Sequence, residues 1–177
     1  MSVLFFIFLN MLCGVMFMRT IVYRREQAAA YAKRWALGRN PAYFDFQGIG
    51  GDCTNFVSQC LYAGAGVMNF TPQVGWFYRS ANDRTPSWTG VEYLFAFLTE
   101  NRSVGPFGSA VDVTNAKIGD VIQLGSGDGN FYHSLMVMHT YPQITVAAHT
   151  GDALYRPLNT YTYGQIRCIH IDGVRTW

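Results

Sequence analysis

Apolar positions in the first half of the chain recur at three-to-four spacing, which predicts amphipathic helices. A first helix is expected over residues 23–37, with Gly38 at its end. A Gly-rich turn at residues 48–51 precedes a second apolar stripe, which ends at Gly64, where a left-handed cap is natural. The members of this stripe are Cys53, Phe56, Val57, Cys60 and Leu61. Cys53 is therefore expected in the first turn of the second helix.

A third helix is predicted by a capping-box pattern, in which Thr89 is followed three residues later by Glu92. Its apolar face would consist of Val91, Leu94, Phe95 and Leu98.

The second half of the chain has a different period. Short β-branched or alternating segments at residues 121–124, 133–139, 144–149 and 166–171 are separated by Gly, Pro and Asn turns. Such segments predict an antiparallel sheet. Helices followed by a sheet indicate an α+β fold.

Residues 1–18 form an uncharged apolar run that is followed by Arg19, Arg24 and Arg25. Three interpretations stay open: a membrane anchor, an uncleaved signal, or an artefact of the assigned start codon. A real segment would place the protein in the cell envelope or outside the cell, and an artefact would leave it in the cytoplasm. Residues 19–177 are interpreted as one domain.

Composition narrows the function classes. Half of the residues are hydrophobic and 14% are charged, which is typical of a folded globular protein. A net charge of +2 with no basic cluster gives no footprint for nucleic acid. The four cysteines form no CxxC pair, so neither a zinc site nor a disulfide framework is indicated. We expect a monomer with no metal and no cofactor.

Cys53 is the first candidate for chemistry. A thiol attacks as the thiolate, and a helix start lowers the pKa of a thiol through free amide hydrogens and the helix dipole. Gly48, Gly50 and Gly51 allow a tight, exposed turn before the helix, and the Cys53 amide could donate to an oxyanion. The alternative is that Cys53 is a small apolar residue that fills space at a helix start.

His133 is the expected base, and its partner depends on strand register. An odd-length turn at residues 140–142 would place His133 and His149 on the same sheet face, and an even-length turn would place them on opposite faces. Asp152 could replace His149 as the partner of the imidazole, or it could be an ordinary turn residue.

Four further residues are assigned supporting roles. Asp52 is expected to cap the second helix through its charge and hydrogen bonds. Gln47 is a candidate second oxyanion donor. Trp76 and Trp88 are candidates for a substrate groove, although aromatic residues make up 16% of the chain and most of them must lie in the core.

The segment from Gly50 to Leu61, GGDCTNFVSQCL, closely resembles the signature of the bacterial putative amidase domain family, relatives of the NlpC-type and CHAP cell-wall peptidases. Similar members also carry a Tyr-Arg…Ala-Tyr-Ala…Trp helix, Gly-Trp and Ser-Trp pairs, a Gly-Asp-Val-Ile segment, a His-Ser strand and a His-Thr-x-Asp strand. In this chain these are Tyr23 to Trp35, Gly75-Trp76, Ser87-Trp88, Gly119 to Ile122, His133-Ser134 and His149 to Asp152. The resemblance covers roughly Ile21 to Arg167.

The resemblance implies a papain-like fold in which a helix-borne Cys faces a His on the sheet, with a polar third member on the adjacent strand. Cys53 and His133 match the first two positions, and His149 or Asp152 matches the third. It implies hydrolysis of a peptide-like amide, of the kind found in peptidoglycan, through a thioester. A non-catalytic cell-envelope binding module and an acyltransferase with the same Cys-His pair are the alternatives.

Overall fold

The computed structural model of the protein describes residues 17–177. Residues 1–16 of the apolar run 1–18 lie outside this part of the chain, so the anchor, signal and start-codon interpretations stay predictions. None of the helices in residues 17–177 combines the length and the apolar character that crossing a membrane requires.

Within residues 17–177, a seven-stranded antiparallel sheet forms one layer of the fold. Its strands are β1 (Arg19–Ile21), β4 (Gly105–Val111), β5 (Val121–Gly125), β6 (Phe131–His139), β7 (Thr145–Ala148), β8 (Ala153–Pro157) and β9 (Gln165–Thr176). The strand order is β1-β9-β5-β6-β7-β8, and β4 pairs with β9. A separate hairpin pairs β2 (Tyr78–Ser80) with β3 (Asp83–Arg84).

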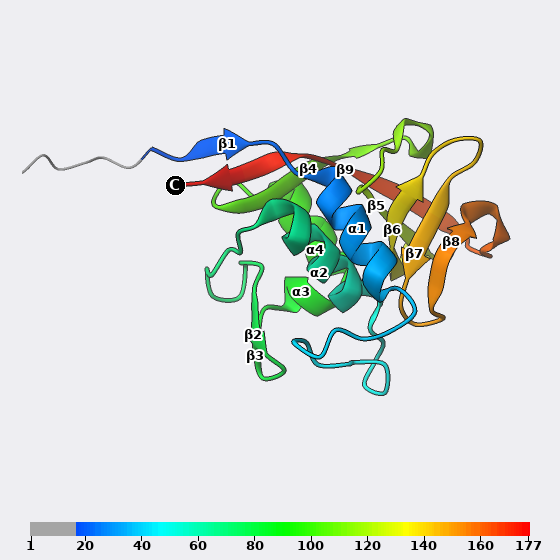
Figure 1. The fold of residues 1–177 in the computed structure, drawn as a ribbon, viewed down its shortest axis with the longest axis horizontal. Coiled ribbons are helices and arrows are strands. Elements are labelled where there is room, and N and C mark those ends of the chain that lie inside the picture. The colour runs from blue at the N-terminus through cyan, green and yellow to red at the C-terminus, as the bar shows by residue number, and fades with distance from the viewer. Residues whose placement is uncertain (1–16) are drawn as a thin grey trace, which may run out of the picture.

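The helices form a second layer on one face of this sheet (Figure 1). They are α1 (Arg25–Trp35), α2 (Cys53–Ala65), α3 (Pro86–Thr89) and α4 (Val91–Glu100). Helix α2 packs against β6, and α4 packs against β4. The expected α+β class, with helices against an antiparallel sheet, is confirmed.

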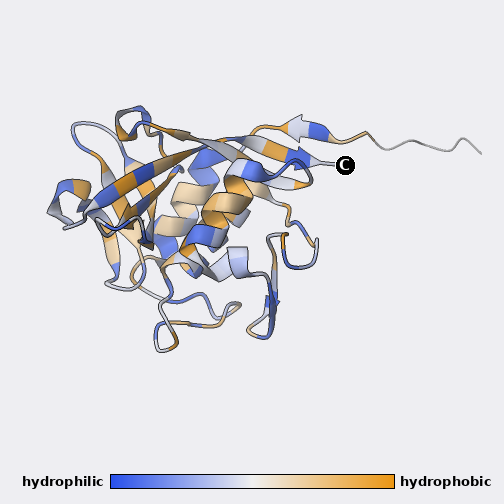
Figure 2. Ribbon diagram, turned by 180° about the vertical axis from the view of Figure 1, so that it is seen from behind, coloured by the Kyte–Doolittle hydropathy of each residue, from blue (hydrophilic) through white to orange (hydrophobic). Residues whose placement is uncertain are grey.

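Two apolar clusters lie on opposite faces of the sheet because successive side chains of a strand point in opposite directions. On β6, Met136 and Met138 join the cluster beneath the helices. Leu135 and Val137 join the cluster on the other face. Figure 2 shows the resulting alternation of hydrophilic and hydrophobic residues along the strands.

Helix α2 continues two residues beyond its predicted end. Gly66, at φ +73°, is the left-handed cap, and its amide donates to the Tyr62 carbonyl. Gly64 instead lies inside the helix, where a Cβ would collide with the Tyr23 ring. The glycine at 64 therefore serves the close approach of the segment before α1, and the predicted cap position is wrong.

The predicted capping box of the third helix is also wrong. Thr89 is the last residue of α3, and Gly90 occupies the cap position of α4 without a side-chain hydrogen bond. The predicted apolar face is only partly correct, because the buried residues of α4 are Leu94, Phe97 and Leu98.

Two strands of five or more residues, β4 and β8, were not predicted. Strand β4 contains Gly105, Pro106 and Gly108, and β8 ends in Pro157 at the edge of the sheet. Proline and glycine weaken the strand pattern in a sequence and are tolerated at edges and irregular positions. Such strands depend on pairing partners that a local pattern does not reveal.

Trp76 and Trp88 do not line a groove. Both indoles are fully buried, with ring centroids 4.9 Å apart. Each indole N–H has an acceptor on α2: Trp76 donates to Ser58 Oγ at 3.1 Å, and Trp88 donates to Asn55 Oδ1 at 2.9 Å. Both residues hold α2 in place from within the core, and the groove prediction is wrong.

Replacing Trp88 by alanine should lower the free energy of unfolding by about 3–5 kcal/mol, because a large buried side chain leaves a cavity. The exposed Trp177 is the matched control, and Trp177→Ala should change stability by about 0.5 kcal/mol or less. Urea unfolding measures both. Equal stability of the two variants would contradict a core role for Trp88.

Candidate active site

Cys53 is the first residue of α2, and the turn before it depends on two glycines. Gly50 and Gly51 have φ values of +98° and +106°, which side chains rarely adopt. A Cβ on Gly51 would also lie 3.3 Å from the Thr150 hydroxyl. The chain therefore enters the helix in close contact with the segment that follows β7.

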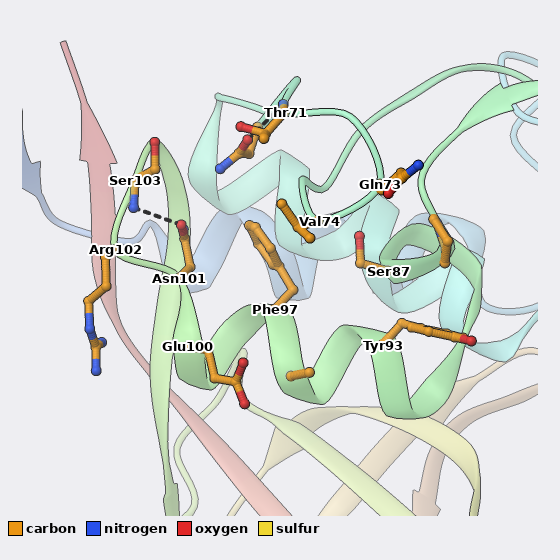
Figure 3. A pocket seen from close by; sticks show the side chains of 13 residues that line it. Thr71, Gln73, Val74, Ser87, Tyr93, Phe97, Glu100, Asn101, Arg102 and Ser103 are labelled. Carbon is orange, nitrogen blue, oxygen red and sulfur yellow. Dashed lines mark hydrogen bonds between the residues drawn. The ribbon is translucent and has the colours of Figure 1, made fainter.

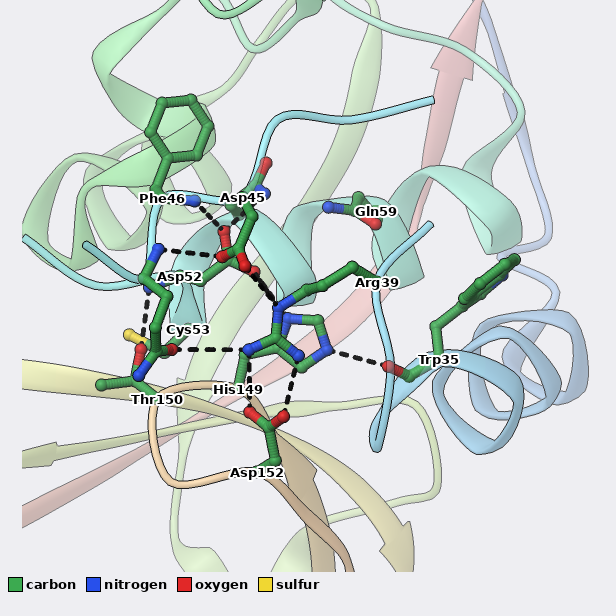
Figure 4. Close-up of polar contacts among 12 residues, drawn as sticks. Trp35, Arg39, Asp45, Phe46, Asp52, Cys53, Gln59, His149, Thr150 and Asp152 are labelled. Atoms are coloured by element: carbon green, nitrogen blue, oxygen red, sulfur yellow. Dashed lines mark hydrogen bonds and ion pairs between the residues drawn. The ribbon is translucent and has the colours of Figure 1, made fainter. Parts of the chain in front are cut away.

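Asp52 ties this helix start to neighbouring segments. Its Oδ1 accepts hydrogen bonds from the Phe46 amide at 2.9 Å and the Asn55 side chain at 2.8 Å. Its Oδ2 lies 2.6 Å from His149 Nδ1, and its backbone amide donates to Thr150 Oγ1 at 2.8 Å. The carboxylate makes no capping bond to α2. Asp52 occupies the N-cap position of α2, as predicted, but its carboxylate contacts Phe46 and His149 instead of forming the predicted capping bond (Figure 4).

Both ring nitrogens of His149 have polar partners on the helix side of the sheet. Its Nδ1 faces the Asp52 carboxylate, and its Nε2 faces the Trp35 carbonyl at 2.9 Å. The ring stacks on Phe56 with centroids 4.1 Å apart. The polar partners of both nitrogens are therefore groups other than the Cys53 thiol.

Arg39 forms ion pairs with the nearby acidic side chains. It forms a bidentate pair with Asp152, at 2.8 and 3.0 Å, and lies 3.3 Å from Asp45 and 3.8 Å from Asp52. This contact with Arg39 lowers the pKa of Asp152. Gln47 Oε1 also accepts from Arg39, at 3.4 Å. Asp152 and Gln47 thus meet at Arg39, and neither is hydrogen-bonded to Cys53 or His133.

The Cys53 sulfur lies against β6. It is 3.8 Å from the Thr54 hydroxyl, which in turn is 3.0 Å from Ser134 Oγ. The Cys53 residue is 7% exposed, and burial raises the pKa of its thiol, with the Ser134 amide and the Thr54 hydroxyl opposing the shift. The sequence predicted that the helix start lowers this pKa. That prediction is wrong, because desolvation of the sulfur raises the pKa more than the nearby hydrogen-bond donors lower it.

His133 directly precedes Ser134 on β6. Its ring lies 6.1 Å from the Tyr161 ring, measured between centroids. Burial, with a smaller contribution from the Arg156 charge, lowers the pKa of His133 to about 4. Within residues 17–177, its ring nitrogens form no hydrogen bond, including none to the Cys53 thiol. At neutral pH the imidazole is therefore uncharged, and within residues 17–177 its nitrogens are not occupied by hydrogen bonds.

His133 and His149 lie on opposite faces of the sheet, although the turn between β6 and β7, residues 140–144, is odd in length and an odd turn was expected to place them on the same face. A register shift between Val137 and His139 reverses the faces. Strands β6 and β7 pair Met136 with Ala147, and this register, continued to the strand ends, sets Ser134 opposite His149. His149 contacts the helices, whereas His133 belongs to the face of Leu135 and Val137. The two imidazoles are not in contact as base and orienting partner.

Sequence reasoning missed Arg39 and Arg156, and it gave no role to Ser134 or Thr150, which it named only as members of the His-Ser and His-Thr-x-Asp motifs. Neither arginine stands in a local pattern that marks a site. Thr150 adopts φ +62°, a conformation that a threonine does not signal in a sequence. The other three act through contacts between distant segments.

A separate cavity of about 810 Å³ lies beside α4 and is lined by residues such as Val74, Tyr93 and Phe97 (Figure 3). It includes none of the predicted site residues. In the described part of the chain, no three His, Cys, Asp or Glu side chains converge to hold a metal ion.

Comparisons with known proteins place this site within a family. Residues 22–171 match the putative amidase domain. The uncharacterized protein YhbB of Bacillus subtilis (strain 168) is 37% identical over 128 residues, which cover 69% of this chain and 39% of that protein. The chain thus spans about two fifths of the length of this relative. No solved structure matches significantly. On the family match, the chain belongs to the putative amidase domain family.

Proposed function

We propose that the protein is a cysteine-dependent amidase that hydrolyses a peptide-like amide, with Cys53 as nucleophile and His133 as base. The position of Cys53 carries this proposal. It is the first residue of α2, and its sulfur lies near the backbone amide of Ser134, the residue after His133. A helix-borne Cys whose sulfur lies against the strand that carries a His is similar to the arrangement of papain-like peptidases, including the NlpC-type and CHAP enzymes that the motif resembles.

Peptidoglycan or a related cell-wall peptide is the proposed substrate class. Support for it comes from the resemblance of residues 50–61 to wall peptidases, since a fold alone does not define a substrate.

The reaction would begin from a neutral thiol and a neutral imidazole. As the sulfur attacks the amide carbonyl, the thiol proton passes to His133 and a sulfur–carbon bond forms. The carbon–nitrogen bond then breaks, and the imidazolium returns the proton to the departing amine. Water attacks the thioester with His133 again as base, which releases the acid and restores the thiol.

Backbone amides would hold the oxyanion. The helical hydrogen-bond pattern of α2 starts with the Phe56 amide, which donates to the Asp52 carbonyl. The amides of Cys53 and Thr54 precede it and have no acceptor within the helix. We assign the oxyanion site to these amides, because they lie beside the sulfur and are unpaired donors within the helix.

His149, Asp152 and Asp52 would act as positioning residues. Neither His149 nor Asp152 contacts His133, so the proposed reaction uses a Cys-His pair. The His149–Asp52 contact and the Arg39–Asp152 pair would fix the helix start that presents the thiol.

A binding module without turnover is the second candidate function. It is favoured by the 7% exposure of Cys53 and by the missing hydrogen bond from its thiol to His133 within residues 17–177. Acyl transfer to an amine would use the same thioester, and analysis of the products distinguishes it from hydrolysis.

Replacing Cys53 by alanine should lower amide hydrolysis by about a thousandfold or more, because no thioester can form. Replacing His133 by glutamine should lower kcat by about 10²–10⁴-fold. The assay is amine release from a panel of cell-wall peptide fragments.

The matched control is Cys60→Ala, since Cys60 is a buried thiol of the same helix. It should keep kcat within about twofold of the natural protein, because it is remote from the reacting atoms. Full activity in Cys53→Ala would overturn the nucleophile assignment. Binding of a fragment without hydrolysis by the natural protein would support the binding module.

The acid limb of kcat/KM should lie near pH 4, because His133 stays neutral above its lowered pKa of about 4. The free energy of unfolding should also depend on the titration of His133. The unfolded chain binds a proton at His133 near pH 6.5 and the folded chain only near pH 4, so stability is lost as the pH falls through this window. Rate profiles and urea unfolding between pH 4 and 7 test both effects.

His133→Gln should show a weaker loss of stability over this window, because it removes the group that titrates. An acid limb near pH 6.5, together with equal stability losses in the natural protein and His133→Gln, would refute the desolvated imidazole.

A further inference from the structure

Arg156 is a positive charge near the proposed site with no acidic partner. In the part of the chain that the structure describes, no carboxylate lies within ion-pair distance of its guanidinium. Arg39, by contrast, is paired with Asp152, and Arg167 is paired with Glu92. A guanidinium left without a counter-charge beside a reaction site is available to an anionic ligand.

The guanidinium of Arg156 is held in place by neutral groups. Its Nε donates to Thr160 Oγ1 and its Nη2 to the Thr160 carbonyl, both at 3.0 Å. Its central carbon lies 3.9 Å from the centroid of the Tyr161 ring. Within residues 17–177, Nη1 has no hydrogen-bond acceptor. The group is therefore ordered before any ligand binds, which lowers the entropic cost of binding.

Arg156 lies on the same face of the sheet as His133. Strand pairing sets Arg156 beside Val146 and Val146 beside Val137. Val137 is four residues from His133 along β6, so their side chains share a face. The Tyr161 ring joins the two, since it stacks on Arg156 and lies 6.1 Å from the His133 ring.

We propose that Arg156 is a specificity-determining residue that binds a substrate carboxylate close to the scissile amide. This inference rests on the proposed hydrolysis at Cys53. The preferred substrates would be peptides with an acidic side chain or a free terminal carboxylate next to the cleaved bond. A charge-assisted pair with arginine gives such a group both affinity and a fixed orientation.

Binding of the carboxylate has a consequence for His133. The Arg156 charge contributes to the low pKa of this imidazole. A bound carboxylate offsets that charge, so His133 becomes a stronger base only when a matching substrate is present. The acid limb of kcat, which reports the substrate complex, should therefore lie at higher pH than the acid limb of kcat/KM for acidic substrates.

The experiment compares acetylated tetrapeptides that differ only in Glu or Gln on either side of the cleaved amide, and in a free or amidated carboxyl end. The natural protein should favour the acidic member of a pair by about 10–100-fold in kcat/KM. Arg156→Gln should abolish this preference and the separation of the two acid limbs, while Arg156→Lys should retain part of both. Unchanged preference in Arg156→Gln would overturn the proposal.

Arg34→Gln is the matched control. Arg34 also stacks on an aromatic ring, that of Trp35, but lies at the end of α1 on the helix layer. It should keep the natural preference.

Titration of the same peptides into Cys53→Ala protein separates this inference from the proposed function. Tighter binding of acidic peptides that depends on Arg156, without hydrolysis by the natural protein, would refute the amidase and support the carboxylate site. Hydrolysis without a charge preference would refute the carboxylate site alone. A panel that is neither cleaved nor bound would refute both.

Discussion

The buried contact between Asp52 and His149 holds the site together. The two residues are 97 positions apart in the chain, both are 1% exposed, and their polar atoms approach to 2.6 Å. Removing one partner of such a pair typically costs about 3–5 kcal/mol, because the other is left buried without compensation. The contact fixes the end of β7 against the start of α2. It thereby determines where Cys53 lies.

The same contact is connected to the core. Asn55 donates to the Asp52 carboxylate and accepts from the Trp88 indole, so a continuous set of hydrogen bonds runs from the sheet to the buried aromatic residues. A site on this scaffold has little freedom to adjust. The rigidity fits a role in which the helix start must offer its amides at a fixed place. Burial of the sulfur at this helix start raises the pKa of Cys53.

Local pattern was sufficient for α1, α2 and the central strands β5, β6 and β7, since each of these carries a clear apolar pattern. It also placed Cys53 at a helix start. It was insufficient where the outcome depends on distant segments. Asp52 has the chemistry of a capping residue, but its carboxylate contacts His149. Trp88 was predicted to line a groove, but its side chain is fully buried, which the sequence does not show. The relative faces of His133 and His149 depended on a register shift in the pairing of β6 with β7, and the direction of the Cys53 pKa shift depended on burial. No spacing in the sequence encodes either.

The central claim is that the Cys53 sulfur becomes acylated during turnover. Acid quenching of the protein with a cleavable peptide, followed by digestion and mass spectrometry, measures this directly. We expect the mass of the acyl group on the fragment that contains Cys53, and its disappearance after treatment with hydroxylamine, which cleaves thioesters. Product formation without any adduct on that fragment, or an adduct on another residue, would contradict the account.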